Sequence, residues 1–249
     1  GYEEAAALGL MAGINASLWI LGKAPFTLGR DEAYMGIMID DIVTKGTHEP
    51  YRLLSSRSEY RLITRNDNAD TRLIQKGYDI GMVPKDRFDR LNNSNVLIFN
   101  TIKTLEEHQI ASNKKIREYL LSLGFNEPNG NENLKLTMRR QNVKYGELRK
   151  CVDFLPELDE GEQFKIETEI KYEGYIIAER KEAERRKGYE SLLLPDGLDY
   201  KHMDGLSLEA REKLTLLRPK TLGEASRITN VHPSDIDVLS FYVRHQEKK

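Results

Sequence analysis

The chain has 249 residues, enough for one large domain or two modest domains with a real hydrophobic core. Apolar residues make up 39% and charged residues 31%, and the net charge of −2 argues against a uniformly basic coat for nucleic acid and fits a charge-rich helical protein of the cytoplasm. No apolar run approaches the roughly 18 to 20 residues of a membrane span, and a single cysteine excludes an internal disulfide framework.

Residues 2–21 predict the first helix. Glu3 and Glu4 stand in its first turn, where they complement the positive end of the helix dipole. Apolar residues cover almost the whole circumference, so we expect the helix to be buried. Because the chain starts at Gly1 without an initiator methionine, we expect it to be a piece of a longer protein.

A second apolar stretch, residues 35–43, is rich enough in β-branched side chains to favour a short strand or a buried turn. The adjacent carboxylates of Asp40 and Asp41 at its end could serve acid–base chemistry, although neighbouring carboxylates more often cap or solvate the end of an element. Further on, Ser56 and Glu59 have the spacing of a capping box, which favours a short helix there over a strand.

The middle of the chain has helical periodicity interrupted by polar breaks. The Asn-rich stretch 126–133 is the clearest internal loop, and residues 156–161 form a predicted junction. We expect helices near residues 67–78, 85–110 (one long or two short), 114–123 after a cap at Ser112, 136–140 and 145–154.

The last ninety residues predict a long helix followed by a small helical bundle. The long helix is expected over residues 164–186. The three short helices of the bundle are expected at 207–217, at 221–228 after a capping box of Thr221 and Glu224, and at 233–245, where Pro233 follows a cap at His232.

The usual catalytic motifs are absent from the sequence. It contains no glycine-rich phosphate loop, no zinc-protease motif and no nucleophile elbow, and its five histidines show no ligand-like spacing with Cys151. Cys151 stands in an apolar helical setting, where a buried thiol is usually inert. We therefore expect no catalytic residue and no metal site within this chain.

One segment combines arginines with aromatic residues. Arginine forks suit phosphates, and aromatic rings suit unstacked bases. Composition alone favours a simpler interpretation, a solvated helical face on which Glu59 and Asp67 pair with the arginines. The segment includes Tyr51, Arg52, Arg57, Tyr60, Arg61 and Arg65.

The amino-acid sequence of residues 49–70 resembles the signature of the GidA or MnmG family. This is the large flavoprotein subunit that, with a GTPase partner, builds 5-carboxymethylaminomethyl-type groups on the wobble uridine of transfer RNA. Similar resemblances occur at residues 1–7, at 30–36 with Asp40 and Asp41, at 171–176 and at 218–228, whereas residues from about 87 to 161 are only loosely similar.

The resemblance implies a mainly α fold in three parts. Residues 1–45 would be the C-terminal remnant of a flavin-binding α/β domain, with its end-helix buried. Residues 46–157 would form a helical region that carries the arginine-rich segment, and residues 158–249 a C-terminal helical bundle.

The resemblance also implies a function. The full-length protein would be an enzyme that binds FAD, takes hydride from NADH, forms a homodimer and modifies transfer RNA in the cytoplasm, with its catalytic residues upstream of this chain. The implied cofactor-binding residues are Gly1, Tyr2, Glu3 and Glu4. The implied transfer RNA contacts are Arg52, Arg57, Arg61 and Arg65.

The remaining expectations concern partners and the isolated chain. The C-terminal bundle would bind the GTPase partner, and no membrane would be involved. The chain alone should retain no flavin and should be inactive. The alternative is a non-catalytic helical adaptor that binds protein or RNA.

Overall fold

The computed structural model describes residues 1–44, 49–110, 113–126, 132–190 and 192–246. In these residues the regular structure is helical, and the strand-like pairing consists of two isolated bridges, Gln109 with Asn133 and Leu193 with Thr221. The predicted mainly α fold is therefore confirmed. Within the same ranges, no helix has both the length and the apolar character that crossing a membrane requires.

The chain divides into two compact units. The first contains residues 1–60 and 178–249, and the second contains residues 61–177. The predicted division at 1–45, 46–157 and 158–249 stays a prediction, because compact units record packing and need not coincide with domains.

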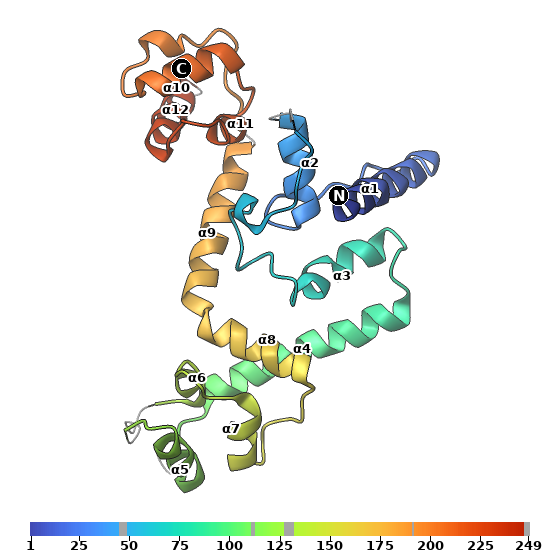
Figure 1. Cartoon of the computed structure of the whole chain (residues 1–249), viewed down its shortest axis with the longest axis vertical. Helices are drawn as coiled ribbons and strands as arrows, with labels where there is room; N and C mark the ends of the chain where they lie inside the picture. The colour runs from blue at the N-terminus through green and yellow to red at the C-terminus, as the bar shows by residue number, and fades with distance from the viewer. Residues whose placement is uncertain (45–48, 111–112, 127–131, 191, 247–249) are drawn as a thin grey trace. The chain divides into compact units, whose positions relative to one another are not determined.

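The first unit holds α1 (Tyr2–Ile20), α2 (Tyr34–Thr44), η1 (Ser55–Arg57), most of α9 (Glu173–Glu190), η2 (Tyr200–His202), α10 (Leu208–Leu217), α11 (Leu222–Ser226) and α12 (Pro233–Gln246). The second holds α3 (Ala69–Asp79), α4 (Lys85–Glu107), α5 (Lys114–Ser122), α6 (Leu134–Met138), α7 (Tyr145–Cys151) and α8 (Glu160–Lys171). Figure 1 labels the α-helices along the chain.

The predicted first helix is confirmed as α1, but it is buried along one strip only. Ala7, Met11 and Leu18 are buried, whereas Tyr2 is 95% and Trp19 is 82% exposed. Since the apolar residues of α1 surround its axis, the neighbouring α2 covers only the side that faces it. The expectation of a fully buried end-helix is not met by the residues described.

The short strand or buried turn predicted at residues 35–43 was wrong, because this stretch lies inside the helix α2. A short apolar run does not separate a strand from a buried helix by periodicity. Gly36 at the start of α2 allows the preceding loop to approach closely: a Cβ atom there would lie 2.3 Å from the carbonyl oxygen of Gly29. Ile37 and Met38 are fully buried.

The capping box predicted at Ser56 does not form. Residues Ser55–Arg57 make a single 3-10 turn, and Ser58 then takes extended backbone angles (φ −85°, ψ 129°). The helix therefore ends before Glu59, which bonds to Arg30 instead. The expected helical face with Arg57 and Arg61 one turn apart is absent.

In the second unit the predicted helices are largely confirmed. Most of the predicted stretch 85–110 is one continuous helix, α4, which runs through the polar residues 92–95 and ends at Glu107. The cap predicted at Ser112 lies outside the described residues, as does most of the loop 126–133, and Asn113 caps α5 by accepting from the Ile116 N–H at 3.1 Å. The core of this unit packs α4 to α8 together and includes Leu105, Ile116, Leu120, Leu134, Met138, Tyr145, Leu148, Ile166 and Ile170.

The long helix predicted over 164–186 is two helices. A capping box of Asp159 and Glu162 starts α8 earlier than expected, inside the predicted junction. The chain then leaves helical geometry at Tyr172 before α9 begins. The carboxylate of Glu173, at the start of α9, pairs with Lys135 of α6 at 2.8 Å and with Arg139, so tertiary contacts mark this break.

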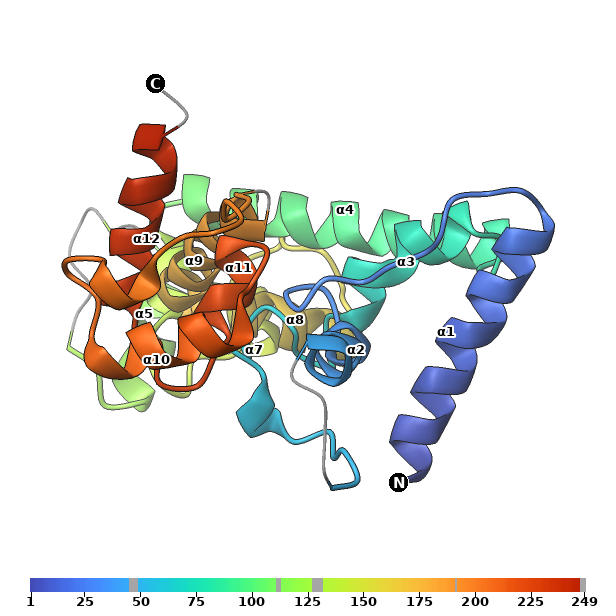
Figure 2. The same cartoon turned by 90° about the horizontal axis from the view of Figure 1, so that it is seen from above.

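The predicted C-terminal bundle is confirmed as α10, α11 and α12, which lie together in Figure 1 and in the turned view of Figure 2. Thr221 caps α11, as expected, and Ser207, predicted as the first residue of its helix, caps α10. Glu224 completes its part of the cap differently from the prediction, because its carboxylate accepts from the N–H of Lys220 at 2.7 Å. The bundle core includes Tyr200, Ala210, Leu214, Leu222, Ala225, Ile236, Leu239 and Val243.

Candidate functional site

A cluster of charges ties the arginine-rich segment to α2 in the first unit. We call Arg30, Asp40, Asp41 and Glu59 the Arg30 cluster. The guanidinium of Arg30 donates to Asp40 at 2.9 Å and Asp41 at 2.7 Å through Nη1, and to Glu59 at 2.7 Å through Nη2. It also donates to the carbonyl oxygens of Ile37 at 3.3 Å and of Arg57 at 3.5 Å.

The Arg30 side chain is only 12% exposed. Burial alone lowers the pKa of Arg30, but the hydrogen bonds and charges of Glu59 and Asp41 outweigh it, so the pKa lies above its ordinary value. Arg30 is therefore a permanently charged centre for three carboxylates. The adjacent carboxylates of Asp40 and Asp41 serve this cluster, consistent with a structural use rather than acid–base chemistry.

The cluster continues to the exposed Arg57 through Tyr51. The Tyr51 hydroxyl donates to Asp41 at 2.7 Å, and the Arg57 guanidinium lies 4.3 Å from the centre of the Tyr51 ring. Burial and the bond to Asp41 raise the pKa of Tyr51 above its ordinary value, so this hydroxyl remains a donor at any physiological pH. Tyr51 thus forms a buried platform under an exposed arginine.

The segment also meets the start of α1. The N–H of Leu53 donates to the Glu4 carboxylate at 2.8 Å, and this bond holds the pKa of Glu4 below its ordinary value. A Cβ atom on Gly1 would lie 2.3 Å from Nη1 of Arg52. The structure therefore brings the predicted flavin-proximal residues together with Arg52.

The other two arginines belong to the second unit, and they differ from one another. Arg65 bonds to Asp67 at 3.0 Å, Glu169 at 2.8 Å and the carbonyl oxygen of Leu62 at 2.6 Å, and its side chain is 12% exposed. Arg61 is exposed.

These pairings revise the expected ion pairs. Glu59 pairs with Arg30, and Asp67 pairs with Arg65. Among the residues that the structure describes, no carboxylate forms an ion pair with the exposed arginines Arg52, Arg57 and Arg61.

On its far side, the Arg30 cluster reaches the C-terminal bundle within the same unit. Nε of Arg227, at the end of α11, lies 3.2 Å from Asp40, and Nζ of Lys187 on α9 lies 2.8 Å from Asp31. A cavity of about 270 Å³ lies here, lined by both signs of charge, including Arg30, Glu59, Arg186 and Arg227. The carboxylates of Asp31, Asp40 and Glu59 all have cationic partners, so the positive and negative charges around this cavity offset one another.

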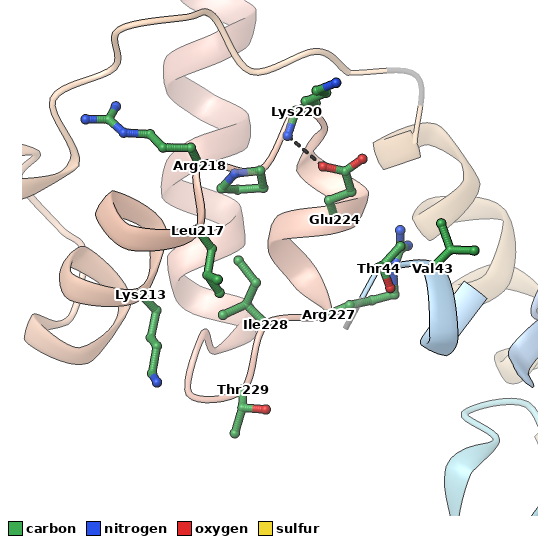
Figure 3. A pocket seen from close by; sticks show the side chains of 11 residues that line it. Val43, Thr44, Lys213, Leu217, Arg218, Lys220, Glu224, Arg227, Ile228 and Thr229 are labelled. Atoms are coloured by element: carbon green, nitrogen blue, oxygen red, sulfur yellow. Dashed lines mark hydrogen bonds between the residues drawn. The ribbon is translucent and has the colours of Figure 1, made fainter. Parts of the chain in front are cut away.

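A larger cavity of about 530 Å³ opens between the bundle and the end of α2. Figure 3 shows Leu217 and Ile228 close together, with Lys213 beside them and Arg227 next to Thr44. Among the residues that the structure describes, no aromatic side chain lines this cavity and could stack on a base.

The sequence did not reveal the contacts of three residues of this site. Arg30 and Tyr51 were inside recognised segments, but their partners, 29 and 10 residues away, could not be inferred from spacing. Glu4 was assigned to the flavin edge, and its bond to Leu53 across 49 residues gave no local signal.

Cys151 is consistent with the expected inert thiol. It is half-buried at the end of α7 in the second unit, and burial raises the pKa of the thiol above its ordinary value. The thiolate fraction at neutral pH is correspondingly small.

Comparison with known proteins places this architecture in a family. The profile described as tRNA modifying enzyme MnmG/GidA C-terminal helical domain matches residues 85–180, and the profile described as tRNA modifying enzyme MnmG/GidA C-terminal helical bundle matches residues 182–249. Together they define a class of protein, the helical C-terminal regions of transfer RNA-modifying enzymes.

Curated relatives agree over the whole chain. The chain is 44% identical over 250 residues to the tRNA uridine 5-carboxymethylaminomethyl modification enzyme MnmG of Clostridium kluyveri. The matching region covers all of this chain and 40% of that protein. The enzyme of the same name from Lactobacillus delbrueckii subsp. bulgaricus is 44% identical over 245 residues, covering 98% of this chain and 39% of that protein.

A solved structure has the same fold. The structure of Aquifex aeolicus GidA in the form II crystal superimposes with a TM-score of 0.71 at 36% sequence identity, covering 98% of this chain and 38% of that chain. The chain belongs to the MnmG/GidA family and corresponds to its C-terminal part. It spans about 40% of the length of the curated relatives it matches.

Proposed function

We propose that this chain is the C-terminal part of an enzyme that modifies the wobble uridine of transfer RNA, and that it supplies RNA- and partner-binding surfaces. The names of the curated relatives support the reaction class. The activity belongs to a protein of the relatives' length, so the chain alone acts as a binding module and is expected to be inactive.

The observation that carries the RNA-binding role is the contrast between exposed and anchored charges in the arginine-rich segment. The side chains of Arg52, Arg57 and Arg61 are exposed without an ion-pair partner among the described residues. The backbone beneath Arg57 is fixed by Arg30, Tyr51 and Glu59. A guanidinium held without a carboxylate suits phosphates or base edges.

Arg65 is the exception among the four proposed RNA contacts. Its guanidinium is committed to Asp67, Glu169 and Leu62. We therefore assign direct contact to Arg52, Arg57 and Arg61, and to Arg65 a role in holding the second part of the segment.

The start of α1 fits the edge of a flavin that carries negative charge. Gly1 makes no side-chain cap, so the first N–H groups of the helix are not occupied by a capping side chain, and Arg52 approaches the same point. Gly1, Tyr2, Glu3 and Glu4 would hold this edge through their backbone, with Glu4 itself turned to Leu53. Bound FAD would supply the redox chemistry, with NADH as hydride donor, and the isolated chain should not retain it.

The C-terminal bundle offers apolar surface for the GTPase partner. Leu208, Leu216 and Phe241 are all exposed on α10 and α12, and the cavity of Figure 3 lies beside Leu217. These three side chains are the contacts that we propose for the partner, since an interaction surface of this kind is apolar. The homodimer and the cytoplasmic location rest on the family resemblance alone.

Equilibrium binding of transfer RNA tests the proposed function. We expect Arg57→Lys to weaken binding by on the order of 1 to 3 kcal/mol, because lysine keeps the charge but loses the bidentate fork. Arg185→Lys is the matched control, since Arg185 lies on α9 of the same unit and pairs with its neighbour Glu182. Equal affinity of the Arg57 variant and the control would remove Arg57 from the RNA site.

A further inference from the structure

The loop that carries Arg57 has little structure of its own. Between α2 and α3 the only helical element among the described residues is η1, and the backbone is extended on both of its sides, at Leu54 and Ser58. Such a loop keeps one shape only where other side chains fix it. The anchors of residues 51–60 therefore decide where the Arg57 guanidinium points.

Besides the bond from the Leu53 N–H to Glu4, two anchors lie on either side of Arg57 and converge on Arg30. Glu59 accepts two bonds from Arg30, at 2.7 Å from Nη2 and 3.3 Å from Nε. On the other side, Asp41 is shared: one oxygen accepts from Arg30 at 2.7 Å and the other from the Tyr51 hydroxyl at 2.7 Å. The Arg30 guanidinium thus fixes the extended residues after Arg57. Through Asp41 it also fixes the Tyr51 ring on which the Arg57 guanidinium lies.

Arg30 does not itself present a free surface to a ligand. Its side chain is 12% exposed, and all three of its nitrogens donate to protein acceptors. A role in RNA binding would therefore be exerted through Arg57.

Only arginine can make this set of bonds. The guanidinium carries five N–H groups on three nitrogens, so Nη1 can serve α2 while Nη2 and Nε serve the loop. A lysine ammonium has three donors on one atom and reaches either Asp40 and Asp41 or Glu59.

We propose that Arg30 is a positioning residue that holds the Arg57 loop, residues 51–60, in its RNA-binding form. This inference rests on the proposed function of Arg57. It adds a residue without RNA contact whose loss should weaken RNA binding.

Two measurements on the 249-residue chain test it. Amide hydrogen exchange without RNA reports the loop directly, through the N–H groups of Arg57 and Ser58 that bond to Leu54 and Ser55. Fluorescence anisotropy with labelled transfer RNA reports affinity. The variants are Arg30→Lys, Arg57→Lys and their combination, with Arg185→Lys as control.

We expect Arg30→Lys to speed exchange at Arg57 and Ser58 by about tenfold or more, with the amides of α10 and α12 unchanged. Transfer RNA affinity should fall by about five- to tenfold. The combined variant should bind no more than about twofold more weakly than Arg57→Lys alone, because residues that act through one another are not additive.

Glu59→Ala provides a second route if the Arg30 variant is poorly folded. Glu59 is on the loop side of the cluster, so its removal leaves Asp40 and Asp41 on Arg30. It should reproduce both the faster exchange and the loss of affinity.

The outcomes separate the two claims. Unchanged exchange in Arg30→Lys and Glu59→Ala, or losses of affinity that multiply in the combined variant, would overturn the positioning role while leaving the function of Arg57 intact. Unchanged affinity in Arg57→Lys would instead overturn the proposed function, and the positioning role in RNA binding with it.

Discussion

Asp235 near the start of α12 should hold the C-terminal bundle together, although it carries no predicted function. Its carboxylate is 1% exposed and accepts from the N–H of Ser207 at 2.8 Å, the hydroxyl of Ser207 at 3.2 Å and the N–H of His232 at 2.9 Å. It thereby joins the start of α10 to the start of α12.

Asp235→Asn keeps the shape but replaces one acceptor oxygen by an NH2 group. In either amide orientation the NH2 group then faces a partly buried donor, either the N–H of Ser207 or that of His232. Leaving one such group unsatisfied and removing the charge should lower the free energy of unfolding by about 2 to 3 kcal/mol. The thermal midpoint should fall by about 5 to 10 °C, at ~2–4 °C per kcal/mol.

Urea denaturation followed by circular dichroism measures this change. Asp237→Asn is the matched control, because Asp237 is on the same helix, is 68% exposed and lies 3.8 Å from its partner Arg185. Equal stability of the two variants would contradict the proposed role of the Asp235 carboxylate.

The difference should also depend on pH. Burial raises the pKa of Asp235, but the bonds from Ser207 and His232 outweigh it, so the pKa lies below its ordinary value of 3.8. A lowered carboxyl pKa adds stability that is present above the unfolded pKa and lost as the pH falls through the folded pKa. The stability gap between the wild type and Asp235→Asn should therefore be constant near neutral pH and narrow below about pH 4.

Two further substitutions test the packing around the proposed site. Gly36→Ala should lower the free energy of unfolding by about 1 to 3 kcal/mol, because its Cβ would meet the backbone of Gly29 at 2.3 Å. The control is Gly9→Ala on the open side of α1, which should be neutral or stabilise by up to ~1 kcal/mol. Equal melting temperatures of the two variants would contradict the close approach at Gly36. Arg65→Lys should lower the thermal midpoint and leave RNA affinity per folded molecule unchanged. Arg61→Lys should lower RNA affinity and leave the thermal midpoint unchanged. The same pair of changes in both variants would refute the assignment of different roles to Arg65 and Arg61.

Local signals in the sequence predicted most of the helices. Caps and periodicity act over a few residues, which is why α3, α10, α11 and α12 began close to their expected starts. The strand prediction for α2 failed because a continuous apolar run fits either a buried helix or a strand. Packing against α1 decided between them.

The site was predictable only in part. The four arginines could be found from composition and resemblance, but their environments could not. Arg65 meets Glu169 across 104 residues, and Arg30 meets Glu59 across 29. Spacing in the sequence carries no information about such pairs. Only the structure could therefore distinguish the arginines proposed to contact RNA from Arg30 and Arg65, which bond within the protein.

The central claim is that the exposed arginines of residues 51–61 contact transfer RNA. Ultraviolet cross-linking of transfer RNA to the chain, followed by mass spectrometry of the peptides, tests it most directly. We predict cross-linked peptides that contain Arg52, Arg57 or Arg61. Cross-links confined to the C-terminal bundle, with none in this segment, would contradict the account.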